Sequence, residues 1–129
     1  MRYLVMVKYD ESGTPPPQSL LDALARNRRE ARQAGALVAV GGLLPSASGA
    51  RVRLAGGRLT VTDGPFTETK ELVGGYSVYN VKSKQAAVDW TYRVMTLFAE
   101  HWPEGECEAE VRQIVDAPEF NLNIQEQER

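Results

Sequence analysis

The order of strand-like and helix-like segments is the feature that most constrains the fold of this 129-residue chain. Runs of β-branched and aromatic residues predict strands, whereas apolar residues spaced three to four apart predict helices. The predicted order is strand, helix, strand, hairpin, strand, helix, strand. These segments comprise residues 3–9, 20–34, 36–44, 51–62, 76–81, 83–101 and 106–115. Without the hairpin, this is the βαββαβ order of a ferredoxin-like unit, which is an α+β fold.

Short signals mark the ends of both predicted helices. Ser19 followed by Asp22 matches a capping box and predicts the start of the first helix. Gly35 is a typical residue for ending that helix, and Ser83 is a suitable N-cap for the second. Between them, Gly41-Gly42 interrupts an apolar strand and predicts either a bulge or a close approach of a neighbouring segment.

The first predicted helix has an apolar stripe and a basic remainder. The stripe is predicted from Leu20, Leu21, Leu24, Ala31 and Ala34. The basic side chains are Arg26, Arg28, Arg29 and Arg32. These arginines either bind a phosphate or carboxylate group or form an ordinary solvated surface.

The predicted hairpin has two chemically different faces. Its strands flank a Gly56-Gly57 turn, a sequence typical of tight hairpins. Strict alternation places Val52, Leu54, Leu59 and Val61 on one face. The arginines lie on the other face, which we expect to be exposed.

One face of the predicted sheet has no helix to cover it. Both helices of a βαββαβ unit lie on the same side of the antiparallel sheet. The sequence contains no third helix. We therefore expect a second copy of the chain to cover the bare face, giving a homodimer with facing sheets.

Composition is that of a soluble globular domain, with 43% hydrophobic and 25% charged residues. No apolar run approaches the ~20 residues of a membrane span, and residues 1–9 lack the pattern of a signal peptide. We expect a cytoplasmic protein without a membrane partner. The single cysteine, Cys107, excludes an intrachain disulfide and a cysteine-cluster metal site.

Charge is distributed unevenly along the chain. Residues 1–60 contain nine Lys and Arg against four Asp and Glu, whereas residues 100–129 contain two against nine. A direct nucleic-acid binder would show a basic surplus, so this function is not expected. Either the basic helix meets the acidic segment, within one chain or across a dimer, or both are solvated surfaces.

The most distinctive motif follows the hairpin. Asp63-Gly64-Pro65-Phe66 precedes residues 67–71 and then Gly74-Gly75-Tyr76. This stretch closely resembles the motif region of the YCII-related, or DGPF-domain, family. Residues 39–43 and 110–120 also resemble that family's second strand, closing strand and C-terminal turn. The resemblance covers residues 1–120, and residues 121–129 form a polar C-terminal tail.

The resemblance implies a dimeric α+β barrel and, in many bacteria, an association with extracytoplasmic-function sigma factor systems. It implies no established reaction. Some relatives are proposed to use a His–Asp pair, with the histidine in the first helix region. In this chain arginines and Asn27 occupy that helix, and the single histidine, His101, lies at the end of the second helix. Asp63 is therefore the candidate catalytic residue that the motif offers.

The motif residues each allow two interpretations. Asp63 either stabilises the tight turn through its own backbone or acts as a general base or ligand acceptor. Lys70 and Glu71 either belong to a solvated charged loop or point into a dimer cleft, where one of them pairs with Asp63. Phe66 either anchors the loop or stacks on a ligand. We expect Tyr9, Tyr76 and Tyr79 to line the same pocket.

Other candidate residues favour structural roles. His101 suits the C-terminal end of a helix dipole better than catalysis. Acidic neighbours are expected to raise the pKa of Cys107, which disfavours a reactive thiolate. No metal-ligand cluster, phosphate loop or dinucleotide fingerprint is present in the sequence, so no metal or cofactor is expected.

Two functions remain open at this level. The first is a small-molecule-binding protein or enzyme with the Asp63 loop at a dimer-cleft pocket. The second is a non-catalytic regulatory or interaction partner, linked to a sigma factor system. The first predicts an apolar pocket with Asp63 on its wall. The second predicts no such pocket and an exposed apolar patch.

Overall fold

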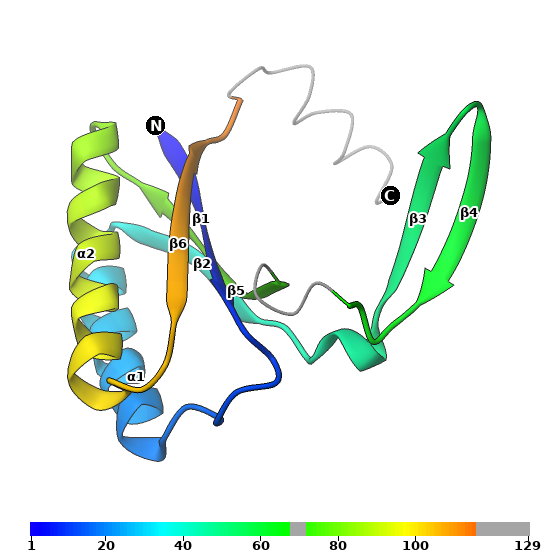
Figure 1. Cartoon of the computed structure of the whole chain (residues 1–129). Coiled ribbons are helices and arrows are strands. Elements are labelled where there is room, and N and C mark those ends of the chain that lie inside the picture. Colours follow the sequence, from blue (N-terminus) through cyan, green and yellow to red (C-terminus); the bar gives the residue numbers. More distant parts are fainter. Residues whose placement is uncertain (68–71, 116–129) are drawn as a thin grey trace.

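The chain forms a four-stranded antiparallel sheet with two helices on one face and a separate hairpin (Figure 1). The computed structural model describes residues 1–67 and 72–115. The elements are β1 (Arg2–Tyr9), α1 (Gln18–Gln33), β2 (Leu37–Gly42), a 3₁₀ turn η1 (Ser46–Ser48), β3 (Ala50–Ala55), β4 (Arg58–Asp63), β5 (Leu72–Asn80), α2 (Lys84–His101) and β6 (Cys107–Gln113). The predicted mixed α+β fold is confirmed.

The sheet has the strand order β2-β5-β1-β6, and every pairing is antiparallel. β1 is central: its Tyr3 pairs with Tyr79 of β5 on one side and with Gln113 of β6 on the other. The sheet therefore joins the first strand of the chain to the last described one.

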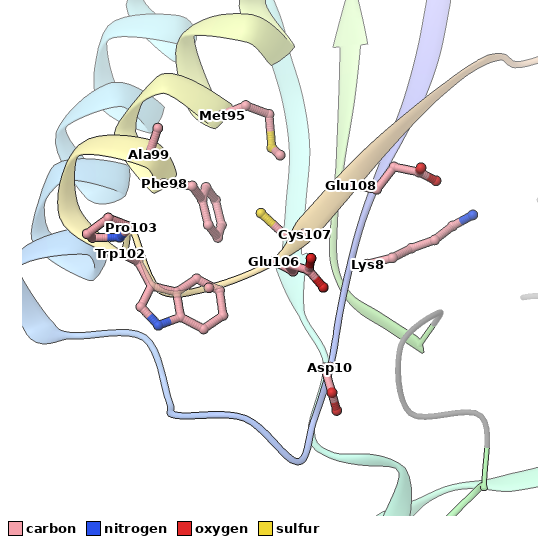
Figure 2. A pocket seen from close by; sticks show the side chains of 11 residues that line it. Lys8, Asp10, Met95, Phe98, Ala99, Trp102, Pro103, Glu106, Cys107 and Glu108 are labelled. Atoms are coloured by element: carbon pink, nitrogen blue, oxygen red, sulfur yellow. The ribbon is translucent and has the colours of Figure 1, made fainter.

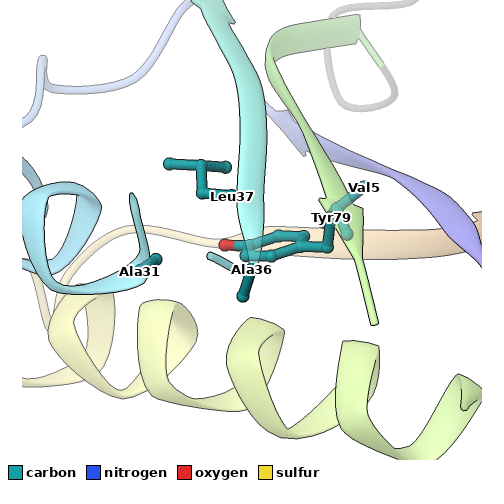
Figure 3. Close-up of a cluster of buried hydrophobic side chains, with 5 residues drawn as sticks. All are labelled: Val5, Ala31, Ala36, Leu37 and Tyr79. Carbon is teal, nitrogen blue, oxygen red and sulfur yellow. The ribbon is translucent and has the colours of Figure 1, made fainter. Parts of the chain in front are cut away.

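The core lies between this sheet and the two helices. Tyr3 and Val5 alternate along β1 and are only 3% and 4% exposed. A buried cluster of small, branched and aromatic side chains connects the layers: Val5, Ala31, Ala36, Leu37 and Tyr79 (Figure 3). Alanines on α1 let the helix approach the sheet closely, because they occupy little volume.

Helix α1 begins differently from the prediction. Its N-cap is Pro17, no side chain caps it, and Ser19 lies inside the first turn. The capping box is therefore wrong. Pro17 is extended, and its carbonyl accepts hydrogen bonds from the backbone N–H groups of Leu20 and Leu21. Proline at this position fixes the backbone without a side-chain cap.

The other predicted helix ends are confirmed. Gly35 has φ of +75° and directly follows α1. Its left-handed conformation lets the Ala36 N–H reach the Ala31 carbonyl at 2.9 Å. At the start of α2, the Ser83 Oγ accepts a hydrogen bond of 3.1 Å from the Ala86 N–H.

The buried stripe of α1 is rotated relative to the prediction. Leu21 is 46% exposed, whereas Asn27 is buried. The residues buried on this helix are Leu20, Ala23, Asn27 and Ala31. Their spacing is regular for a helix, so the stripe passes through a polar residue.

The sheet face opposite the helices carries half-exposed apolar side chains. Leu4 and Met6 alternate with the buried Tyr3 and Val5, so they lie on this second face. Val78 is the partner of Leu4 in the neighbouring strand and shares that face. Both described helices lie on the other side (Figure 1).

The hairpin of β3 and β4 forms a two-stranded sheet of its own. Gly56 and Gly57 make its turn with φ of +57° and +75°, as the sequence predicted. It projects away from the main sheet on the side without helices (Figure 1). We call residues 50–63 the ribbon. Among the described residues, no helix is long and apolar enough to cross a membrane.

Candidate functional site

A cavity of about 470 Å³ lies between helix α1 and the sheet. It is lined by the following side chains and glycines: Val7, Tyr9, Leu20, Leu24, Asn27, Arg28, Val40, Gly42, Gly75, Ser77, Tyr79 and Phe98, among others. We call it the α1 cavity. Its volume and its largely apolar walls are typical of sites for small molecules.

Paired glycines create the space. Gly42 of β2 and Gly75 of β5 are cross-strand partners. Both occupy the helix-facing side of their strands, as Val40 and Ser77 do two positions away. A Cβ at Gly42 would meet no atom within 4 Å, so the position opens onto empty space. Side chains at this pair would fill the volume that the glycines leave beneath α1.

Asn27 is the polar group of this cavity. Its side chain belongs to the buried stripe of α1 and is only 7% exposed. Among the residues that the structure describes, none forms a hydrogen bond with its amide. The amide atoms are not among the fully buried polar atoms, so they face the open space of the cavity, where water or a bound polar group can be their partner.

Tyrosines line the same cavity. Tyr9, Tyr76 and Tyr79 are all among its lining residues. Burial is the main cause that raises the pKa of Tyr79, so its phenol stays neutral at physiological pH. Tyr9 packs its ring edge-on against Trp102, with centroids 6.3 Å apart. The rings of Tyr9 and Tyr79 are thus held by aromatic neighbours, Trp102 and Trp90, whereas Tyr76 is 38% exposed.

The motif loop is fixed by Ser46 rather than by contact with this cavity. Ser46 is buried, and its backbone N–H and hydroxyl donate to the two carboxylate oxygens of Glu11 at 2.6 and 2.7 Å. Its Oγ accepts a hydrogen bond of 3.1 Å from the Phe66 N–H. A Cβ at Gly64 would collide with the Ser46 carbonyl, so the motif glycine allows this close approach.

Phe66 lies beneath a cation. The Arg51 guanidinium carbon is 3.9 Å from the centre of the Phe66 ring, a cation–π arrangement. The ring also approaches Gly49 at the start of the ribbon. Phe66 therefore connects the motif loop to β3.

The predicted site residues fall into separate regions in the single chain. Tyr9 and Tyr76 line the α1 cavity. Asp63 ends β4 and is exposed, and neither it nor Phe66 is among the lining residues of that cavity. Lys70 and Glu71 lie outside the described residues. The catalytic role of Asp63 stays a prediction, because it concerns a cleft between two copies.

A second cavity, of about 610 Å³, lies where α2 approaches β6 (Figure 2). Phe98 and Trp102 form one wall, and Glu106 and Glu108 come from the opposite side. The indole Nε1 of Trp102 is buried without a hydrogen-bond partner among the described residues. This cavity is more acidic than the α1 cavity and lacks a cluster of tyrosines.

Cys107 lies on the wall of this second cavity. Burial raises the pKa of its thiol. The predicted direction holds, but its cause differs, because desolvation and not the flanking acids produces the shift. Across residues 1–67 and 72–115, no group of three or more His, Cys, Asp or Glu side chains could hold a metal ion.

Asn27 is the site residue that the sequence analysis did not single out. Its signal is present in the sequence, because a polar residue replaces an apolar one at helical spacing between Ala23 and Ala31. The predicted stripe included the exposed Leu21 and left out the buried Asn27.

The fold and cavity define a small α+β protein with a pocket between a helix and an antiparallel sheet. The chain belongs to the YCII-related domain family, whose model matches residues 1–114. It is 33% identical over 95 residues to an uncharacterized protein of Rhizobium meliloti (strain 1021), a match covering 70% of this chain and 77% of that relative.

Among solved structures, the chain is similar to a 5-chloro-2-hydroxyhydroquinone dehydrochlorinase from Burkholderia phenoliruptrix AC1100, in complex with 2,5-dihydroxybenzoquinone. The two share 14% sequence identity, and the TM-score is 0.48. The match covers 92% of this chain and 98% of that one.

Proposed function

We propose that this protein binds a small, largely apolar molecule in the α1 cavity and recognises its polar group through Asn27. The observation that carries the proposal is the position of Asn27: the residue is 7% exposed, it lies on the wall of a 470 Å³ cavity, and its amide has no hydrogen-bond partner among the described residues. An amide both donates and accepts hydrogen bonds, so a carbonyl or hydroxyl group satisfies it.

The other lining residues define the class of ligand. Tyr9 and Tyr79 offer aromatic surfaces, and Leu20 and Leu24 complete an apolar wall. Such walls suit a ring-containing compound. Arg28 also lines the cavity and favours a ligand with a carboxylate or another anionic group.

The proposed functional form is a homodimer. The strand order β2-β5-β1-β6, with two helices on one face, supports the expected ferredoxin-like unit and, with it, the dimeric α+β barrel arrangement. Leu4, Met6 and Val78 supply an apolar surface on the face without helices. In such a dimer Asp63 is the candidate general base at the cleft between the subunits.

A thermal-shift screen of carbonyl, phenolic and carboxylic ring compounds tests the ligand proposal. The variants are Asn27→Leu and, as a matched control, Gln33→Leu, which replaces an exposed amide on the same helix. We expect compounds that raise the Tm of the wild type and of Gln33→Leu but not that of Asn27→Leu. Equal shifts in all three proteins contradict a site at Asn27.

Catalysis is tested separately from binding. Because Asp63 does not line the α1 cavity, every compound of the screen is incubated with the wild type and with Asp63→Asn, whether or not its binding depends on Asn27. Conversion is followed by mass spectrometry. We expect Asp63→Asn to retain binding and to lose any turnover, because the amide cannot accept the proton. Turnover at an undiminished rate in Asp63→Asn contradicts the role of Asp63.

A further inference from the structure

One face of the ribbon is an exposed apolar patch. Val52, Leu54, Leu59 and Val61 are each between 69% and 71% exposed. Val52 pairs with Val61 and Leu54 pairs with Leu59, so the four side chains form two adjacent cross-strand pairs. Single exposed apolar residues are common on proteins, but a contiguous group at this exposure indicates a binding surface.

The opposite face of the ribbon is polar. Arg53 pairs with Thr60, and Arg51 pairs with Thr62. The ribbon therefore has the alternation of a strand pair with one buried and one solvated side. An isolated two-stranded ribbon is at best marginally stable in water. In the described part of the chain, β3 and β4 form a sheet only with each other, so the apolar face needs a cover.

The position of the ribbon identifies its partner. It projects from the side of the main sheet that has no helices (Figure 1). On this side, no described helix covers the face that carries Leu4 and Met6. A protein partner that packs on this sheet face therefore lies beside the ribbon. Facing sheets are separated by about 10 Å, whereas a strand of six residues such as β3 is about 20 Å long. The ribbon is thus long enough to reach beyond a second sheet that packs against the main sheet of its own chain.

The area that the ribbon can bury also favours one partner that contacts both the ribbon and the sheet face without helices. Four aliphatic side chains bury roughly 400 Å² at most. A stable interface needs about 1,000 Å² or more. The ribbon is too small to hold a partner alone, but it is large enough to extend an interface that the sheet face begins.

We propose that the ribbon packs its apolar face against a second copy of this chain, in the dimer whose sheets face each other. The inference rests on the proposed dimer but not on the ligand of the α1 cavity. Two-fold symmetry places one ribbon on each side of the dimer, so every ribbon contact occurs twice.

This packing has a consequence for the motif. Asp63 follows Leu59 and Val61 at two-residue intervals on β4 and therefore lies on the same face of the ribbon. It pairs with Ala50 at the base, where the ribbon joins the main domain. Packing of the ribbon on the partner brings Asp63 to the boundary between the two subunits.

Sedimentation velocity over a range of concentrations tests the proposal. Leu54→Lys/Leu59→Lys places two charges on the apolar face, and Ala55→Lys/Thr60→Lys places two on the opposite face of the same ribbon. We expect the dimer dissociation constant to rise at least tenfold in the first variant and less than threefold in the second. Circular dichroism and thermal unfolding show whether each variant is folded.

The outcomes separate the two proposals. A dimer that both variants weaken equally, or that neither weakens, overturns the ribbon contact while the dimer itself stands. A wild type that is monomeric at every concentration overturns both. Asn27-dependent ligand binding is measured independently of either result.

A photo-cross-linker in place of Val61 provides a second measurement that does not depend on stability. We expect a covalent product of twice the chain mass, mapped by mass spectrometry to the partner. A product confined to one chain, for example with residues 116–129, means that the chain covers its own ribbon, and this result overturns the proposal.

Discussion

The main sheet and the ribbon are built from the same alternating pattern, but within residues 1–67 and 72–115 only the main sheet has a cover. In β1, the apolar Tyr3 and Val5 are 3% and 4% exposed, because α1 and α2 pack on that face. In the ribbon, Val52 and Val61 are each 70% exposed. Alternation thus determines which side chains share a face, whereas the tertiary arrangement determines whether that face is buried.

The difference has an energetic meaning. Burial of a Val or Leu side chain contributes about 1.5–3 kcal/mol. The sheet face gains this free energy from the described helices of the same chain, whereas the ribbon face gains it in the proposed association with a second chain. Part of that gain is offset by the entropy lost when two chains associate. Stability of the domain and stability of the dimer should therefore respond to different residues.

A matched pair of leucine substitutions gives the largest expected contrast. Leu20 is fully buried on α1, whereas Leu59 is 71% exposed in the ribbon. Leu20→Ala should lower the free energy of unfolding by about 2–5 kcal/mol, because it leaves a cavity in the core. Leu59→Ala should change it by less than about 0.5 kcal/mol in the monomer. Urea unfolding at low protein concentration measures both. Comparable losses contradict an uncovered ribbon face in the monomer.

Gly64 tests the junction between the two regions. A Cβ at this position collides with the backbone carbonyl of Ser46, which cannot move as a side chain can. Gly64→Ala should therefore cost about 1–3 kcal/mol. Gly42→Ala is the control, because its Cβ meets nothing within 4 Å. It should leave stability nearly unchanged but reduce ligand binding, since the methyl group enters the α1 cavity. The reverse order of stabilities would refute this account of the junction.

Ser46 should have the next largest effect. Ser46→Ala removes the hydroxyl that donates to Glu11 and accepts from the Phe66 N–H. We expect a loss of about 1–2 kcal/mol, because a part-buried donor and a carboxylate lose their partner. Ser48→Ala, two residues further in the same turn, is the control. Denaturant unfolding compares the two, and similar stabilities would show that the motif loop does not depend on this bond.

Much of the fold could be predicted from local sequence. Some residues act through backbone conformation and nearby hydrogen bonds, so their roles can be predicted from the sequence. Examples are Gly35, Ser83 and the Gly56-Gly57 turn. Ser19 failed as a cap because Pro17 already supplied an extended residue with an accepting carbonyl before the helix. A capping pattern of two polar residues arises often by chance, and the local backbone decides between candidates.

The site was less predictable, because it depends on register. The α1 cavity needs Gly42 and Gly75 to be cross-strand partners, and these residues are 33 positions apart in the chain. Asn27 becomes significant only once that cavity lies beneath α1. Tyr9 and Tyr76 were selected as pocket residues from the expected fold, whereas Asp63 was selected from the motif alone. In the single chain the first two line the cavity and Asp63 does not.

The smallest expected effect concerns a charged group on the sheet face that lacks helices. Glu110 accepts hydrogen bonds from Lys8 at 2.7 Å and from Arg112 at 3.1 Å. The bond from Lys8 is the main reason, and the bond from Arg112 the second, that the pKa of the Glu110 carboxyl lies below its usual range. A lowered pKa in the folded state contributes stability above the unfolded pKa of ~4.3, and this contribution disappears as the pH falls through the folded value. Glu110→Gln should therefore destabilise the protein slightly at pH 7 and by less at pH 3. Urea midpoints at the two pH values measure this, with the exposed Glu104→Gln as the control. A difference that is the same at both pH values would mean that Glu110 acts through packing rather than through its charge.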